Sequence, residues 1–97
     1  MQENNIHIIT RCSRLKNIKT VKDSIFGNSI FKDRVFWHVI FDTSSLIEIP
    51  VKTLNLLQEK NITVYYKDIG NHGLKVINDV ILDIEKKDDW IYFIDFT

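Results

Sequence analysis

The chain has 97 residues, which suffice for a single domain with one hydrophobic core. Its apolar content of 44% excludes a disordered chain, and its 13 basic and 13 acidic residues are interleaved, so that no basic surface for nucleic acid or anionic membrane is expected. A single cysteine excludes an intramolecular disulfide, and no apolar run approaches the roughly 20 residues that cross a bilayer. We expect one cytoplasmic, soluble domain over residues 1–97, without nucleic-acid or membrane partners.

Short apolar runs that end at polar residues predict the strands. The runs are rich in β-branched and aromatic residues and are too short for buried helices. The second run is continuous, so we expect helices to cover both of its faces, and the last run is almost wholly apolar, which is typical of a buried strand. After the first run we expect a polar turn that starts at Thr10 and Arg11. The predicted strands cover residues 6–10, 35–41, 62–66 and 90–97.

Apolar residues that recur every three or four positions predict an amphipathic helix after each of the first three strands. The first helix has Ser13 as its expected N-cap and ends near Gly27. The second begins at Pro50, because proline suits the first turn, and runs to residues 60–61. The third follows the glycine-rich loop at residues 70–73.

This alternation predicts an α/β fold. Crossover helices make neighbouring strands parallel, so we expect a three-layer, Rossmann-like βαβαβαβ domain with a four-stranded parallel sheet in the order 3-2-1-4. Ligands of such sheets bind outside the carboxyl ends of the strands, at the switch point between the first and last strands. The candidate residues at this edge are Thr10, Arg11, Asp42, the loop at 70–73 and Asp95.

Each of these candidates has a functional and a structural interpretation. Arg11 could donate two parallel hydrogen bonds to a phosphate or a base edge, or pair with a nearby carboxylate. Asp42 could accept from a base or a ribose hydroxyl, or cap the turn into Ser44. The loop at 70–73 precedes a helix, where free N–H groups favour an anion, but Asn71 as an N-cap explains the loop equally well. The loop matches neither phosphate-binding fingerprint.

Histidine and cysteine give no sign of metal-centred or nucleophilic chemistry. His72 has no second histidine or cysteine at the spacing of zinc ligands. His7 and His38 lie inside predicted strands, where we expect them to be core or face residues. Cys12 has no orienting partner that the sequence identifies, so we expect no catalytic residue.

Four segments, taken in order and spacing, resemble the nucleotide-binding half of a GT-A glycosyltransferase. They are residues 8–11, 37–44, 70–73 with Asn78 in the next helix, and 89–95. The resemblance implies a UDP-type nucleotide sugar, whose nucleoside would contact Thr10, Arg11 and Asp42. It also implies that Gly73 and Asn78 help to form the diphosphate and sugar side.

The last strand in that family ends in an Asp-x-Asp metal motif. By resemblance, Asp95 would be the metal ligand and would hold manganese or magnesium with the nucleotide diphosphate. This chain departs from the family there, because Phe96 and Thr97 stand where acidic residues are usual. The half that binds the acceptor and carries the catalytic base has no counterpart in these residues, so we expect the metal site to be weak or lost.

We therefore expect a truncated, glycosyltransferase-like half-domain without transferase activity of its own. Two alternatives stay open at this point. One is an active glycosyltransferase that oligomerisation or a partner chain completes, and the other is a non-catalytic binding or assembly module.

The last strand also predicts a homodimer. Strand order 3-2-1-4 puts it at an edge of the sheet, with unpaired backbone groups beside large apolar side chains and without proline or lysine to discourage pairing. Nothing follows this strand in the sequence, so we expect it to pair with the same strand of a second copy about a two-fold axis. The alternative is a monomer in which the third helix or residues 27–34 cover the edge. The large side chains are those of Trp90, Tyr92, Phe93 and Phe96.

Overall fold

A computed structural model describes residues 5–12, 15–27, 32–44, 48–68, 73–84 and 90–96. It contains one four-stranded sheet in the order β3-β2-β1-β4, in which every neighbouring pair is parallel. The predicted α/β fold and strand order are therefore confirmed. The strands are β1 (Ile6–Cys12), β2 (Val35–Asp42), β3 (Ile62–Lys67) and β4 (Trp90–Phe96). The helices are α1 (Ile18–Phe26), a short 3₁₀ helix (Lys32–Arg34), α2 (Val51–Leu56) and α3 (Gly73–Asp83).

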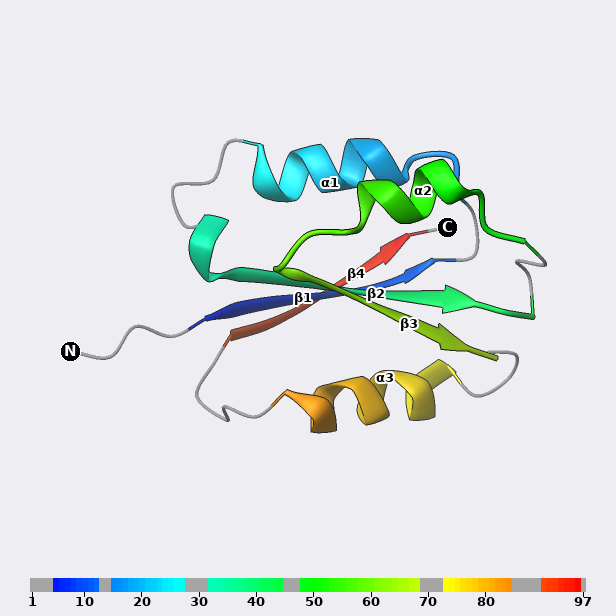
Figure 1. Cartoon of the computed structure of the whole chain (residues 1–97). Helices are drawn as coiled ribbons and strands as arrows, with labels where there is room; N and C mark the ends of the chain where they lie inside the picture. The colour runs from blue at the N-terminus through cyan, green and yellow to red at the C-terminus, as the bar shows by residue number, and fades with distance from the viewer. Residues whose placement is uncertain are drawn as a thin grey trace.

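The sheet lies between two layers of helix (Figure 1). Helices α1 and α2 cover one face and α3 covers the other, which completes the predicted three layers. We call these faces the α1/α2 face and the α3 face. In the part of the chain that the structure describes, no helix is both long and apolar enough to span a membrane.

Alternation along the strands builds a core on each face, because successive side chains point to opposite sides of a sheet. On the α1/α2 face, Trp37 and Phe41 of β2 belong to a buried cluster that includes Ile18 and Ile25 of α1. On the α3 face, Ile9 and Ile40 belong to a second cluster with Val80 of α3, and all three are fully buried. Strand β2 is thus covered on both faces, as its continuous apolar run predicts.

Several element boundaries differ from the prediction. Strand β1 does not turn at Thr10 but continues to Cys12, because its backbone pairs with β2 on one side and β4 on the other through that residue. Helix α2 ends at Leu56 instead of residues 60–61, and the chain then turns directly into β3. Helix α1 begins at Ile18 with Asn17 as its N-cap, so the prediction that Ser13 caps this helix is wrong. The other predicted cap, Asn71, lies outside the described residues.

Strand β4 is an edge strand, as predicted, but the prediction that it is buried is wrong. Its residues Trp90, Ile91, Tyr92 and Phe93 are exposed by 59%, 41%, 53% and 45%. They alternate between the two faces, so neither helical layer covers this strand over these residues. The apolar run reflects two half-covered faces at an edge and not a strand in the middle of the sheet.

Candidate functional site

The candidate site is the carboxyl edge of the sheet beside β1. The strand order reverses between β1 and β4, which is where ligands of open α/β sheets bind. Arg11 lies there, half-buried, with Ile40 of β2 and Asp95 of β4 as its neighbours in register. It shares the α3 face with Ile9, two positions earlier on the same strand. Arg11 therefore lies near the carboxyl end of β1, inside the strand and not in the predicted turn, and its role in ligand binding stays a prediction.

Thr10 lies on the opposite face from Arg11 and is 1% exposed. The indole Nε1 of Trp37 donates a hydrogen bond of 2.9 Å to its hydroxyl oxygen. The predicted turn implied that the side chains of Thr10 and Arg11 converge on one point. They do not, because they lie on opposite faces of the sheet. Thr10 satisfies a buried polar group of the core, and its role in ligand binding stays a prediction.

Asp42 ends β2 and is 8% exposed. Its Oδ1 accepts a hydrogen bond of 3.0 Å from the backbone N–H of Ser44 and another from the Ser44 hydroxyl. This is an Asx turn, in which an aspartate side chain bonds to the backbone two residues on. Asp42 thus caps the turn into Ser44, as its structural interpretation predicts. Its contact with a ribose stays a prediction.

The structure says less about the remaining candidates, which are the loop at 70–73, Asn78 and Asp95. Gly73 is the first residue of α3, and Asn78 is exposed on the same helix. A rise of about 1.5 Å per residue puts Asn78 roughly 7.5 Å along the axis from Gly73. The preceding loop residues 70–72 lie outside the described residues, as does the side chain of Asp95. The roles of Gly73 and Asn78 stay predictions.

The described residues do not offer a good metal site. No three His, Cys, Asp or Glu residues within the described ranges lie close enough together to hold an ion. The backbone of Asp95, the predicted ligand, pairs in register with that of Arg11. Manganese or magnesium binding at Asp95 stays a prediction.

The structure also contains a row of three hydrogen-bonded side chains that could not be predicted from the sequence. His7 Nδ1 and His38 Nε2 are 2.9 Å apart, and His38 Nδ1 lies 3.3 Å from the hydroxyl of Tyr65. The three side chains come from β1, β2 and β3 and lie on the α3 face, where Phe36 stacks on His7. Both histidines are 8% exposed, which agrees with the prediction that they are core or face residues of the sheet. These hydrogen bonds link the three strands through their side chains.

Comparison with known proteins adds no relative. No family model matches the chain, and no curated protein or solved structure matches it either. Membership of the glycosyltransferases therefore stays a prediction that rests on the four sequence segments.

Proposed function

We propose that this chain is a nucleotide-binding domain of the glycosyltransferase-like type, which takes a UDP-type nucleotide or nucleotide sugar at the carboxyl edge of its sheet. The observation that carries the proposal is the position of Arg11 at the end of β1, beside the reversal in strand order. A guanidinium there can donate two parallel hydrogen bonds to a phosphate group. The neighbouring turn at Asp42 adds the hydroxyl group of the exposed Thr43, whereas the N–H groups of Thr43 and Ser44 already donate to the Lys67 carbonyl and to Asp42.

These 97 residues, in our proposal, bind the nucleotide without transferring the sugar. Sugar transfer needs oriented reactants and groups that stabilise developing charge. In the family that the sequence resembles, a pair of acidic residues holds the metal that does this. Here Phe96 and Thr97 follow Asp95, and Arg11 is its neighbour in register.

Replacing Arg11 by alanine should weaken UDP binding about tenfold or more, because a hydrogen bond to a charged group contributes about 1.5–3 kcal/mol. Arg11→Lys should recover part of the affinity, since it keeps the charge but loses the two-pronged geometry. Titration calorimetry with UDP measures both variants. Lys60→Ala is the matched control, because Lys60 is exposed just before β3, at the opposite edge of the sheet. Equal affinities of Arg11→Ala and the unmodified chain would contradict the site.

Manganese should not strengthen UDP binding by more than about twofold, because Asp95 alone supplies one carboxylate and no second acidic residue follows it in the sequence. The same calorimetric titration with and without manganese tests this expectation. A tightening of about tenfold, which corresponds to about 1.4 kcal/mol of coupling, would show that a metal site exists after all.

We also propose a homodimer that forms through β4, which favours an assembly role as the second candidate function. The four exposed side chains of residues 90–93 lie on both faces of this edge strand. A hollow of about 560 Å³ adjoins them on the α1/α2 face, between α1 and the strands, and the described residues that line it are all uncharged. A second strand paired with β4 would satisfy its edge and bring neighbouring side chains alongside those of β4 on both faces. An antiparallel pairing of two β4 strands would do so with two-fold symmetry.

Phe93→Lys should therefore convert a dimer into a monomer, because the added charge lies beside the paired edge. Light scattering coupled to size exclusion, at micromolar concentrations, gives the mass. Leu82→Lys is the matched control, because it also replaces a large exposed apolar side chain by lysine. Leu82 is 80% exposed and lies on α3 and not on the edge strand. A monomer mass for the unmodified chain at high micromolar concentration would rule out this assembly.

A further inference from the structure

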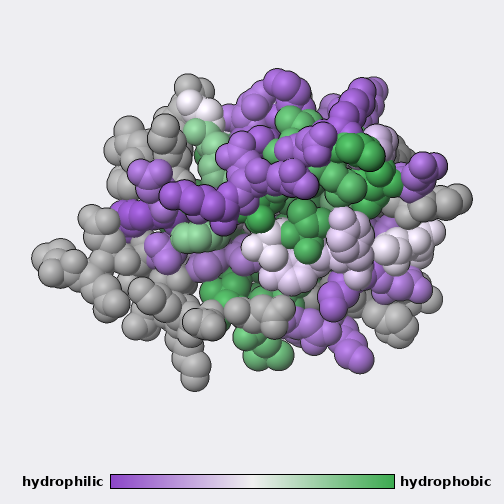
Figure 2. Space-filling view, in the orientation of Figure 1, coloured by the Kyte–Doolittle hydropathy of each residue, from purple (hydrophilic) through white to green (hydrophobic). Residues whose placement is uncertain are grey.

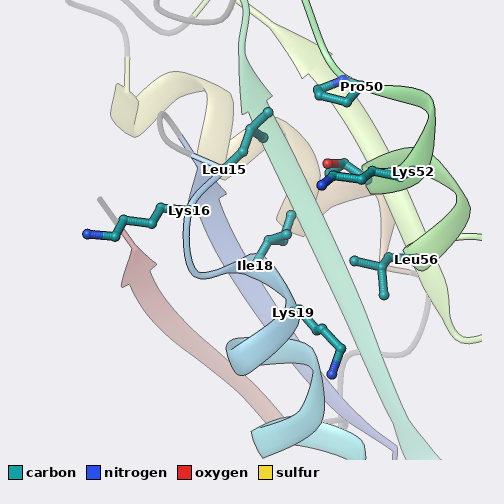
Figure 3. A pocket seen from close by; sticks show the side chains of 8 residues that line it. Leu15, Lys16, Ile18, Lys19, Pro50, Lys52 and Leu56 are labelled. Carbon is teal, nitrogen blue, oxygen red and sulfur yellow. The ribbon is translucent and has the colours of Figure 1, made fainter.

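A groove of about 580 Å³ lies between α1 and α2 (Figure 3). Its apolar lining comes from Leu15 and Ile18 on the α1 side and from Pro50 and Leu56 on the α2 side. Ile18 is 4% exposed and belongs to the core, so the floor of the groove is continuous with the packed interior. In the space-filling view, hydrophobic surface gathers over α2 and is bordered by hydrophilic surface (Figure 2).

The charged residues that line this groove are all basic. Three of its lining residues are lysines, namely Lys16, Lys19 and Lys52, and none is acidic, although the chain as a whole has a formal net charge of zero. Lys52 extends from α2 toward Leu15 and Ile18, whereas Lys16 points away (Figure 3). Lys19 also pairs with Asp23 at 2.9 Å on the surface. Lys52 is therefore the cation best placed to meet a ligand.

The two walls of the groove are tied together. Lys22 of α1 donates a hydrogen bond of 2.6 Å to the carbonyl oxygen of Leu56 and pairs with Glu59 at 3.0 Å. Thr53 of α2, which also lines the groove, is 6% exposed. The groove is thus formed before any ligand arrives, which is usual for sites that bind small molecules.

We propose that this groove binds a single-chain amphiphile with an anionic head group, such as a fatty acid. An alkyl chain would lie along the apolar floor, and its carboxylate would meet the lysine side of the rim. The apolar stems of the lysines extend the walls while their ammonium groups stay in water. The volume lies within the range of about 300–1,000 Å³ that small-molecule sites occupy, and it is small for a docked protein segment. The site is separate from the nucleotide site, because Arg11 lies on the α3 face.

Laurate and dodecyltrimethylammonium, which share a chain length and differ in the sign of the head group, test the proposal directly. Each is titrated below its micelle concentration into the chain, with calorimetry for affinity and amide NMR for location. Laurate should bind about tenfold more tightly than the cationic amphiphile, with shifts at residues 15–19 and 50–56. Equal binding of both amphiphiles, no saturable binding, or displacement of laurate by UDP would overturn the proposal.

A charge reversal then locates the head group. Lys52 is exposed, so Lys52→Glu should keep the fold while it lowers laurate affinity about tenfold and raises the affinity for the cationic amphiphile. Lys60→Glu makes the same change of net charge at an exposed position outside the groove and should leave both affinities unchanged. Identical behaviour of the two variants would contradict a head group at Lys52. UDP binding should survive Lys52→Glu, which separates a failure of this inference from a failure of the nucleotide proposal.

Discussion

Val80→Asp should unfold the domain or leave it marginally stable. Val80 is fully buried on α3, where it packs in a cluster with Ile9 and Ile40 of the sheet. An aspartate there either buries an unpaired charge or forces α3 away from the sheet, and losses above about 4 kcal/mol are usual for such changes. The whole free energy of unfolding of a domain is only about 5–15 kcal/mol. Urea denaturation followed by circular dichroism measures the loss.

Leu82→Asp is the matched control, because it makes a similar change on the same helix at a residue that is 80% exposed. We expect its free energy of unfolding to stay within about 0.5 kcal/mol of the unmodified chain. If Val80→Asp costs no more than Leu82→Asp, α3 does not cover this face of the sheet in solution.

Trp37→Ala should be the second most damaging change and should cost about 3–5 kcal/mol. Trp37 is 1% exposed in the core of the α1/α2 face, and alanine would leave a large cavity there. Part of the loss comes from the hydrogen bond to Thr10, whose removal can be measured separately. Thr10→Val keeps the shape but leaves the indole N–H without this acceptor, which should cost about 1–3 kcal/mol.

A double-mutant cycle separates the hydrogen bond from packing. In Trp37→Phe combined with Thr10→Val both partners are removed, so neither is left buried without the other, and the double change should cost less than the sum of the single changes. The coupling should be about 1 kcal/mol by urea denaturation. Strict additivity would mean that Thr10 and Trp37 do not interact in the folded protein.

The order of elements could be predicted from the sequence because strands and helices have different apolar periods. Apolar residues are continuous in β2 but recur every three or four positions in α1 and α3, which distinguishes strands from helices along the chain. The geometry of crossover connections then allows only a few orders of strands in the sheet. The end of β1 could not be predicted, because Arg11 is charged and resembles the start of a turn. It continues as a strand because β2 and β4 both pair with it.

Contacts that depend on register could not be predicted either. The pairing of His7 with His38 depends on which residues of β1 and β2 lie opposite each other, and the sequence of neither strand contains that information. The exposure of β4 has the same origin, since an apolar run does not tell which strands the helices cover. Arg11 and Asp42 could be placed near the carboxyl ends of β1 and β2 from the sequence, while their role as a binding site stays a prediction. The hydrogen bond of Thr10 with Trp37 in the core could not be predicted, because Thr10 was placed in a turn. Inside β1, successive side chains point to opposite faces, which directs Thr10 toward Trp37.

The most direct test of the proposed function is an amide-resolved NMR titration of the isotope-labelled chain with UDP up to millimolar concentration. We expect saturable shifts at Arg11 and Cys12 and at the turn of residues 42–44, while the groove residues 15–19 and 50–56 stay unaffected. These positions follow from the carboxyl edge beside β1 and from its separation from the α1/α2 groove. An absence of shifts at Arg11 and at residues 42–44 at millimolar UDP would contradict a nucleotide site at this edge.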